Sequence, residues 1–230
     1  MPASLNLCDI AANVRAKRER RKDARPGELL AAALELFVEK GFAATRAEEV
    51  AKRAGVSKGT LFLYFCSKEE LFKAVVRENI SGRFVEWRTE LEQYQGSSAD
   101  LLRYCIGTWW ERVGSTQAAG ISKLMMSEAS NFPELAAFYQ TEVIMPGREL
   151  IRRVLQRGID SGEFRAMDLT YGVYNVMAPM MFLAISKHSG GGCMPESEQM
   201  DVARYISSQV DNILYGLCTR TVPVTPSSSN

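Results

Sequence analysis

Apolar residues recur at helical spacing along most of the chain, and no convincing segment alternates with the two-residue period of a β-strand. The first helical run starts near Pro26, a favoured first-turn residue, and Gly41 is suited to end it. One face of this run carries the apolar residues Leu30, Ala33, Leu34, Phe37 and Val38. The pattern predicts an all-α protein.

Helix start signals follow this run at short spacing. Thr45 with Glu48 predicts a capping box, Ser57 is suited to cap the next helix, and Ser67 with Glu70 predicts another box. The helix that starts at the last box is expected to run to about residue 95. Gly, Pro and Ser clusters then separate helices that are expected near 99–114, 117–129, 133–161, 167–188 and 197–218.

Two short amphipathic segments flank a Gly55-Val56-Ser57 turn, which is the pattern of a helix-turn-helix. In such a unit the second helix enters the DNA major groove, and its first residues reach base edges. Lys58 could donate to guanine or to a phosphate, and Thr60 offers a hydroxyl and a methyl group. Gly59 would let the backbone approach DNA closely. Without the other features, the turn would also suit an ordinary three-helix bundle.

Charge is distributed unevenly along the chain. Residues 1–77 contain fifteen Lys and Arg against ten Asp and Glu, a net charge of +5, whereas the remainder carries −4. The run 15–25 is strongly basic and lacks large apolar residues, so we expect it to be a disordered arm. This arm is either a solvated tail or an extra contact to DNA phosphates or the minor groove.

Motifs for catalysis and for metal binding are not apparent. The five cysteines lie far apart, none of them at metal-ligand spacing, and His188 is the single histidine. A phosphate loop, a dinucleotide fingerprint and a nucleophile elbow are likewise not found. We therefore expect no enzymatic activity, no cofactor and no metal, and we expect reduced thiols in a cytoplasm.

Residues 29–76 resemble the N-terminal domain of the TetR family of transcriptional regulators almost position by position. The matching segments include 32–37, 39–42, 54–61, 64–65 and 67–72. Two positions depart from the family pattern: Cys66 stands where the family usually has proline, and Leu63 where a polar or aromatic residue is common. The resemblance and the helix-turn-helix reading give these candidate DNA-contacting residues: Thr45, Arg46, Ser57, Lys58, Gly59, Thr60, Leu63, Tyr64 and Lys68.

The later part of the chain resembles a C-terminal domain type of the same family more loosely, through segments such as 127–135 and 157–165. That resemblance implies a helical bundle that binds a small effector and forms a homodimer through its last two helices. Aromatic and methionine side chains are abundant here, as either core or pocket. The candidate effector-binding residues are Trp109, Met125, Phe138, Tyr174 and Met177.

These readings predict four segments: a disordered basic arm (1–25), a helix-turn-helix domain (26–76), an effector and dimerisation domain (77–220) and a disordered tail (221–230). The expected function is that of a homodimeric repressor, released from a palindromic DNA operator by a small hydrophobic or aromatic effector. An activator of the same family and a non-specific DNA-binding protein are the alternatives. The uncharged segment 169–186 is expected to be a buried helix and not a membrane span, in a bacterial cytoplasmic protein that associates with the nucleoid.

Overall fold

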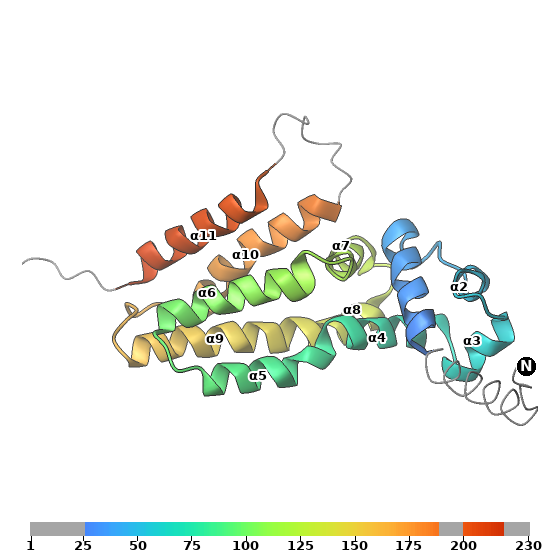
Figure 1. Ribbon diagram of the computed structural model, residues 1–230, viewed down its shortest axis with the longest axis horizontal. Coiled ribbons are helices and arrows are strands. Elements are labelled where there is room, and N and C mark those ends of the chain that lie inside the picture. Colours follow the sequence, from blue (N-terminus) through green and yellow to red (C-terminus); the bar gives the residue numbers. More distant parts are fainter. Residues whose placement is uncertain (1–25, 189–199, 219–230) are drawn as a thin grey trace, which may run out of the picture.

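The computed structural model describes residues 26–188 and 200–218, and these residues fold almost entirely as helices (Figure 1). Residues 26–40 form the first helix. The later helices are α2 (Ala47–Arg53), α3 (Lys58–Tyr64), α4 (Lys68–Asn79), α5 (Phe84–Gln93), α6 (Ser98–Trp109), α7 (Ala119–Glu128), α8 (Pro133–Tyr139), α9 (Met145–Asp160), α10 (Leu169–His188) and α11 (Val202–Leu217). The all-α prediction is confirmed, and the expected arm (1–25) and tail (221–230) lie outside the described residues.

Two of the predicted helix starts are confirmed by their hydrogen bonds. The Ser57 hydroxyl accepts the backbone N–H of Thr60 at 3.1 Å, at the start of α3. The Ser67 hydroxyl accepts the N–H of Glu70 at 3.2 Å, at the start of α4. Between α2 and α3 the chain turns at Gly55, whose φ of 67° favours glycine. The helix-turn-helix is therefore specified locally by its caps and its turn.

The predicted capping box of Thr45 and Glu48 is wrong. Helix α2 begins one residue later, with Arg46 as N-cap, and the Arg46 N–H donates to the Glu49 carboxylate at 3.3 Å. Thr45 is only 1% exposed, and its hydroxyl donates to the carbonyls of Leu36 and Gly41. Burial thus overrides the local signal, because the buried hydroxyl needs internal partners.

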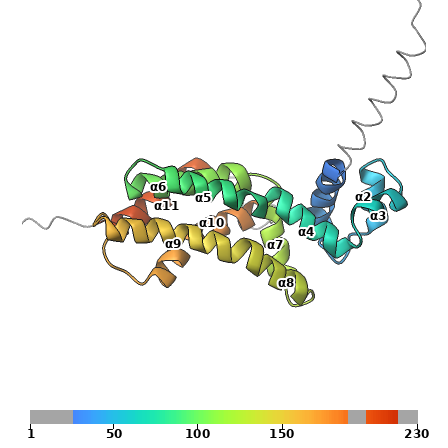
Figure 2. The same cartoon turned by 90° about the horizontal axis from the view of Figure 1, so that it is seen from below.

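The long helix expected from Ser67 to about residue 95 is interrupted. Helix α4 ends at Asn79, a 3-10 turn covers Ser81–Arg83, and α5 follows. Ile80 leaves the helical conformation, and its side chain is buried. A side chain at Gly82 would come within 2.6 Å of the Arg77 carbonyl, so this bend requires glycine. Beyond the break, α5 runs on from α4 along the second domain (Figure 2).

Pro146 and Pro179 both lie within helical segments. The helix of residues 133–160 widens into a π-helical turn at Gln140–Ile144, just before Pro146 in the first turn of α9. A proline lacks the N–H of an α-helical bond, and π turns are a common way to accommodate such an interruption. Pro179 lies inside α10, and the helix continues on both sides of it.

The molecule is elongated, with α2 and α3 at one end and most of the other helices along its length (Figure 1). Helix α4 leads from the helix-turn-helix into the second domain, where α9 packs against both α6 and α10 (Figure 2). One apolar core combines the first helix, α4, α7 and α8, and a second combines α6, α9, α10 and α11. The first core crosses the domain boundary that we predicted at residue 76.

Helix α10 is less buried than the sequence suggested. Within the described residues, Leu169–Lys187 is the one helical stretch long and apolar enough to cross a membrane, by length and composition only, and 33% of it is buried. One face of α10 packs against α7, α9 and α11. The other face exposes aromatic side chains, including Tyr171 and Phe182. The prediction of a buried helix is therefore correct for one face only.

Candidate functional site

Helix α3 presents a largely uncovered face at one end of the molecule. Leu61 points inward and is fully buried, which fixes the rotation of the helix. Leu63 is 83% exposed, and Phe62 and Tyr64 are also exposed. Large apolar side chains on an exposed helix face mark a surface that contacts a partner.

Lys58 lies in the first turn of α3 and is exposed. Its ammonium forms an ion pair with Glu48 on α2 and lies 5.7 Å from the centre of the Phe62 ring. The hydrogen bond from Lys58 lowers the pKa of Glu48 below its usual range. An exposed pair of this kind contributes little stability, so a DNA phosphate or base could replace Glu48 at low cost.

Gly59 has no structural reason to be glycine within the described chain. Its φ is not positive, and an added Cβ would meet only the Ser57 hydroxyl, at 3.7 Å. By contrast, the glycine at position 55 is required by its backbone angle. The absence of a side chain at Gly59 leaves room beside the start of α3, which is where the major groove lies in helix-turn-helix complexes.

The side chains of Thr45 and Lys68 both have partners inside the protein, so the DNA contact predicted for the Thr45 side chain is wrong, whereas that for Lys68 stays a prediction. Thr45 is buried, as described above. The Lys68 ammonium donates to the carbonyls of Phe42, Ala43 and Thr45 at 2.8, 3.3 and 3.1 Å. It also lies 4.4 Å from the centre of the Phe42 ring. Since an ammonium has three donors, this set satisfies Lys68 completely.

The other predicted DNA-contacting residues lie together around α3. Arg46 is exposed at the start of α2. Ser57 is exposed. Its hydroxyl caps α3, and the Thr60 hydroxyl lies 2.9 Å away from it. The structure therefore gathers Arg46, Ser57, Lys58, Gly59, Thr60, Leu63 and Tyr64 at one end of the molecule.

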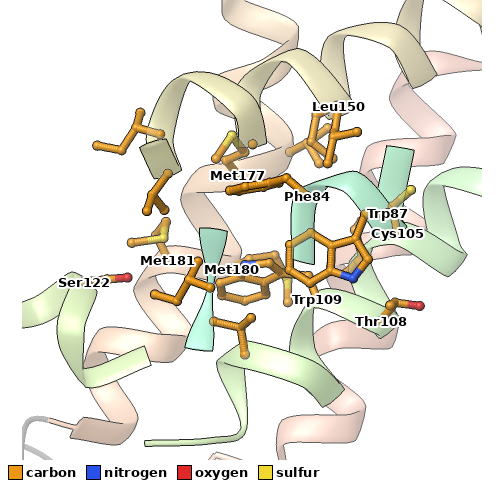
Figure 3. Close-up of a pocket in the computed structure, with 18 of the residues that line it drawn as sticks. Phe84, Trp87, Cys105, Thr108, Trp109, Ser122, Leu150, Met177, Met180 and Met181 are labelled. Carbon is orange, nitrogen blue, oxygen red and sulfur yellow. The ribbon is translucent and has the colours of Figure 1, made fainter. Parts of the chain in front are cut away.

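The second domain encloses a cavity of about 460 Å³ (Figure 3). Helices α5, α6, α7, α8, α9 and α10 all contribute to its wall, which is mostly apolar. Three predicted effector-binding residues line it: Trp109, Met125 and Met177. Further lining residues, not proposed from the sequence, include Phe84, Trp87, Ser122, Tyr139, Met180 and Met181.

Phe138 and Tyr174 do not line the cavity, which corrects two predictions. Phe138 packs beneath the Arg77 guanidinium, at 5.0 Å from its ring centre. Tyr174 is exposed on α10, where its hydroxyl accepts a hydrogen bond from Arg148. In both cases the aromatic ring supports an arginine on the outside of the domain.

Few polar groups face the cavity. The Ser122 and Tyr139 hydroxyls share a buried hydrogen bond of 2.8 Å, and burial raises the pKa of Tyr139 to about 12, so the phenol stays neutral. The indole Nε1 of Trp87 is buried and has no hydrogen-bond partner among the described residues. An unpaired buried donor costs free energy, and Nε1 has almost no accessible surface, so a molecule in the cavity would reach it only after the indole ring turns.

The thiol of Cys105 lies in the cavity wall, and burial raises its pKa to about 11. Because the thiolate is the reactive form, we expect Cys105 to react slowly with iodoacetamide at pH 8, whereas the exposed Cys66 reacts readily. Mass spectrometry of timed samples measures both rates. Equal labelling of the two thiols would contradict the burial of Cys105.

Metal ligands do not gather anywhere in the described ranges 26–188 and 200–218: no three His, Cys, Asp or Glu side chains lie together there. His188 ends α10. The cavity and the α3 face are thus the two candidate sites that the described structure offers.

Known proteins match both parts of the chain. The family described as bacterial regulatory proteins, tetR family, matches residues 29–75, and a tetracyclin repressor-like C-terminal domain matches residues 95–189. The transcriptional repressor KstR2 of Rhodococcus jostii is 30% identical over 146 residues, which cover 63% of this chain and 70% of KstR2. The transcriptional activator FasR of Mycolicibacterium smegmatis is 48% identical over 59 residues, only 26% of this chain and 27% of FasR.

A solved structure shares the fold. The transcriptional regulator FadR of Bacillus subtilis, crystallised in complex with stearoyl-CoA, superposes with a TM-score of 0.64 at 17% identity. The superposition covers 82% of this chain and 97% of FadR. At this identity the likeness concerns the fold alone.

Proposed function

Because the chain belongs to the tetR family of bacterial regulatory proteins, and is therefore a DNA-binding transcriptional regulator and not an enzyme, we propose that it is a homodimeric repressor of the bacterial cytoplasm. The dimer binds a palindromic operator on the nucleoid through its two α3 helices. A small apolar effector in the cavity releases it. The observation that carries this proposal is the capped, uncovered start of α3, with Lys58, Gly59 and Thr60 side by side.

The exposed face of α10 and α11 supports a homodimer. Tyr171 and Phe182 on α10 and Tyr215 on α11 are large, exposed hydrophobic side chains. Packing these helices against their copies would form a four-helix interface and remove this apolar surface from water. A twofold dimer places two α3 helices on one face of DNA, about 34–36 Å apart, to read two half-sites.

The cavity supports an effector with a long apolar body. Its wall is built from aromatic, aliphatic and methionine side chains, and FadR, which has the same fold, was crystallised with stearoyl-CoA. An acyl thioester combines a long apolar chain with a carbonyl acceptor, which the Trp87 Nε1 donor could bind once the indole ring turns towards the cavity. We propose a fatty acyl compound as the effector. A bound effector shifts the equilibrium between the DNA-binding and the released state of the repressor only by the difference in its affinity for these two states.

Replacing Trp87 with phenylalanine tests the effector proposal. The substitution keeps the ring area but removes the Nε1 donor, so we expect stearoyl-CoA to bind roughly 3- to 10-fold more weakly. Trp109→Phe is the matched control. Trp109 also lines the cavity, but its Nε1 does not belong to the buried nitrogens that lack a hydrogen-bond partner. Calorimetric titration measures both affinities, and anisotropy of labelled operator DNA measures release.

Equal affinities of Trp87→Phe and the unaltered protein would contradict the role of the Trp87 donor. A complete lack of stearoyl-CoA binding by the unaltered protein would instead remove acyl compounds as the effector class.

A role as a transcriptional activator is the second candidate function. FasR, which matches the DNA-binding segment, is named as an activator, whereas KstR2 is named as a repressor. A reporter gene behind the selected operator distinguishes the two, since a repressor lowers expression until the effector is added and an activator raises it.

A further inference from the structure

The loop that joins the first helix to α2 is held by a carboxylate from the second domain. Glu128, the last residue of α7, accepts the backbone N–H of Phe42 through Oε1 at 2.8 Å and the N–H of Ala43 through Oε2 at 3.0 Å. Hydrogen bonds to a charged group are stronger than those between neutral groups. The two contacts join segments that are 85 residues or more apart in the sequence.

The same loop is fixed from its other side by α4. The Lys68 ammonium donates hydrogen bonds to the carbonyls of Phe42, Ala43 and Thr45. The carbonyl groups of this segment therefore bind Lys68, while its amide groups donate to the Glu128 carboxylate. The Phe42 ring is fully buried and lies 4.8 Å from the ring of Phe132, which follows α7. The loop is therefore a rigid connection between α7 and the helix-turn-helix.

Gly41 makes the close approach of Glu128 possible. Its φ is 85°, which other residues rarely adopt, and an added Cβ would come within 2.4 Å of Glu128 Oε1. At the other end of α7, Gly120 packs against Val38 of the first helix, where a Cβ would approach within 2.6 Å. Helix α7 thus touches the DNA-binding domain near both of its ends.

Helix α7 is also a wall of the cavity. Ser122, Met125 and Met126 line the cavity, and Glu128 follows within the same turn of helix as Met125. A molecule that presses on these side chains also presses on the helix that ends in Glu128. Helix α7 therefore contacts both the cavity and the DNA-binding domain.

We propose that Glu128 is a positioning residue, which sets the orientation of the helix-turn-helix relative to the second domain and ties that orientation to the cavity wall. This inference rests on the proposed dimeric operator-binding function. With Glu128 in place, each half of the dimer presents α3 at a fixed separation. Without it, each DNA-binding domain keeps its apolar contacts to the second domain, but its orientation is less tightly fixed, so the dimer tolerates different half-site spacings.

The first test is hydrogen exchange of the full-length protein without DNA. In Glu128→Ala the amides of Phe42 and Ala43 lose their acceptor, and we expect them to exchange roughly 10- to 100-fold faster. Glu134→Ala removes an exposed carboxylate from nearby α8 and should leave both amides unchanged. Unchanged exchange in Glu128→Ala would overturn the contact itself, whatever the DNA experiments give.

The second test measures tolerance to half-site spacing. Two inserted base pairs rotate one half-site by about 70° relative to the other. We expect the unaltered protein and Glu134→Ala to lose at least roughly 20-fold in affinity for the spaced operator, and Glu128→Ala to lose less than about 5-fold. Glu128→Gln retains one acceptor oxygen and should fall between them. The ratio of the two affinities is taken within each variant, so a reduced folded fraction does not change it.

The outcomes separate this inference from the function on which it rests. A strong spacing dependence that is identical in Glu128→Ala and in the unaltered protein would overturn the positioning role. An unaltered protein without spacing dependence would contradict the proposed dimeric operator binding, and with it a fixed separation of the α3 helices. A loss of spacing dependence confined to the Glu128 variants would support the inference.

Discussion

Alanine at Lys58 lowers operator affinity by roughly 30-fold or more, and alanine at Thr60 lowers it by a smaller factor. Each change removes one contact per half-site, so a dimer loses two, and a good base contact is worth about 1–3 kcal/mol. Neither change should unfold the domain, because Lys58 is exposed and the α3 cap uses the backbone N–H of Thr60. Anisotropy titration of labelled operator gives both affinities.

The kind of contact made by Lys58 can also be read from the same experiment. If it binds a phosphate, Lys58→Ala should reduce the slope of log affinity against log salt by about 2 per dimer. If it binds a base, the slope should change less and discrimination at one operator position should relax. Arg152→Ala, on the exposed surface of α9, is the control of equal charge. Wild-type affinity in both Lys58→Ala and Thr60→Ala would contradict the assignment of α3.

Glutamate at Phe182 converts the dimer to monomers and lowers operator affinity by about 100-fold or more. Phe182 is 53% exposed on α10 in the single chain, and a charge buried there in a dimer would be unpaired. A monomer reads only one half-site and loses the gain in effective concentration from joining two. Light scattering after size exclusion measures the mass of each variant.

Val85→Glu is the matched control for this change. Val85 is 70% exposed on α5, outside the α10 and α11 face, so the same charge there should leave the dimer intact. A Phe182→Glu protein that remains dimeric and binds the operator would place the interface on another surface.

The helix-turn-helix was predictable because its signals are local. Ser57 and Ser67 cap helices through their own hydroxyls, and Gly55 turns through its own backbone angle. Thr45 shows the limit of such signals, since its spacing to Glu48 fits a capping box but tertiary burial gives its hydroxyl other partners. The break after α4 likewise depends on the packing of Ile80, which local propensity does not reveal.

The cavity was predictable in character but only partly in detail. Abundant methionine and aromatic residues fitted either a core or an apolar pocket, and of the residues proposed for a pocket Trp109, Met125 and Met177 do line the cavity. Phe138 and Tyr174 have the same chemistry but lie outside it, because the rotation of each helix is set by its neighbours. The Glu128 contact spans two domains, so no sequence spacing could indicate it.

Selection of bound sequences from a random DNA pool, with the purified ligand-free protein, tests the central claim most directly. We predict enrichment of a palindrome with half-sites about one DNA turn apart, as expected for two α3 helices in a twofold dimer. Salt-sensitive binding with no enriched sequence would contradict a sequence-specific dimeric regulator and would indicate non-specific DNA binding.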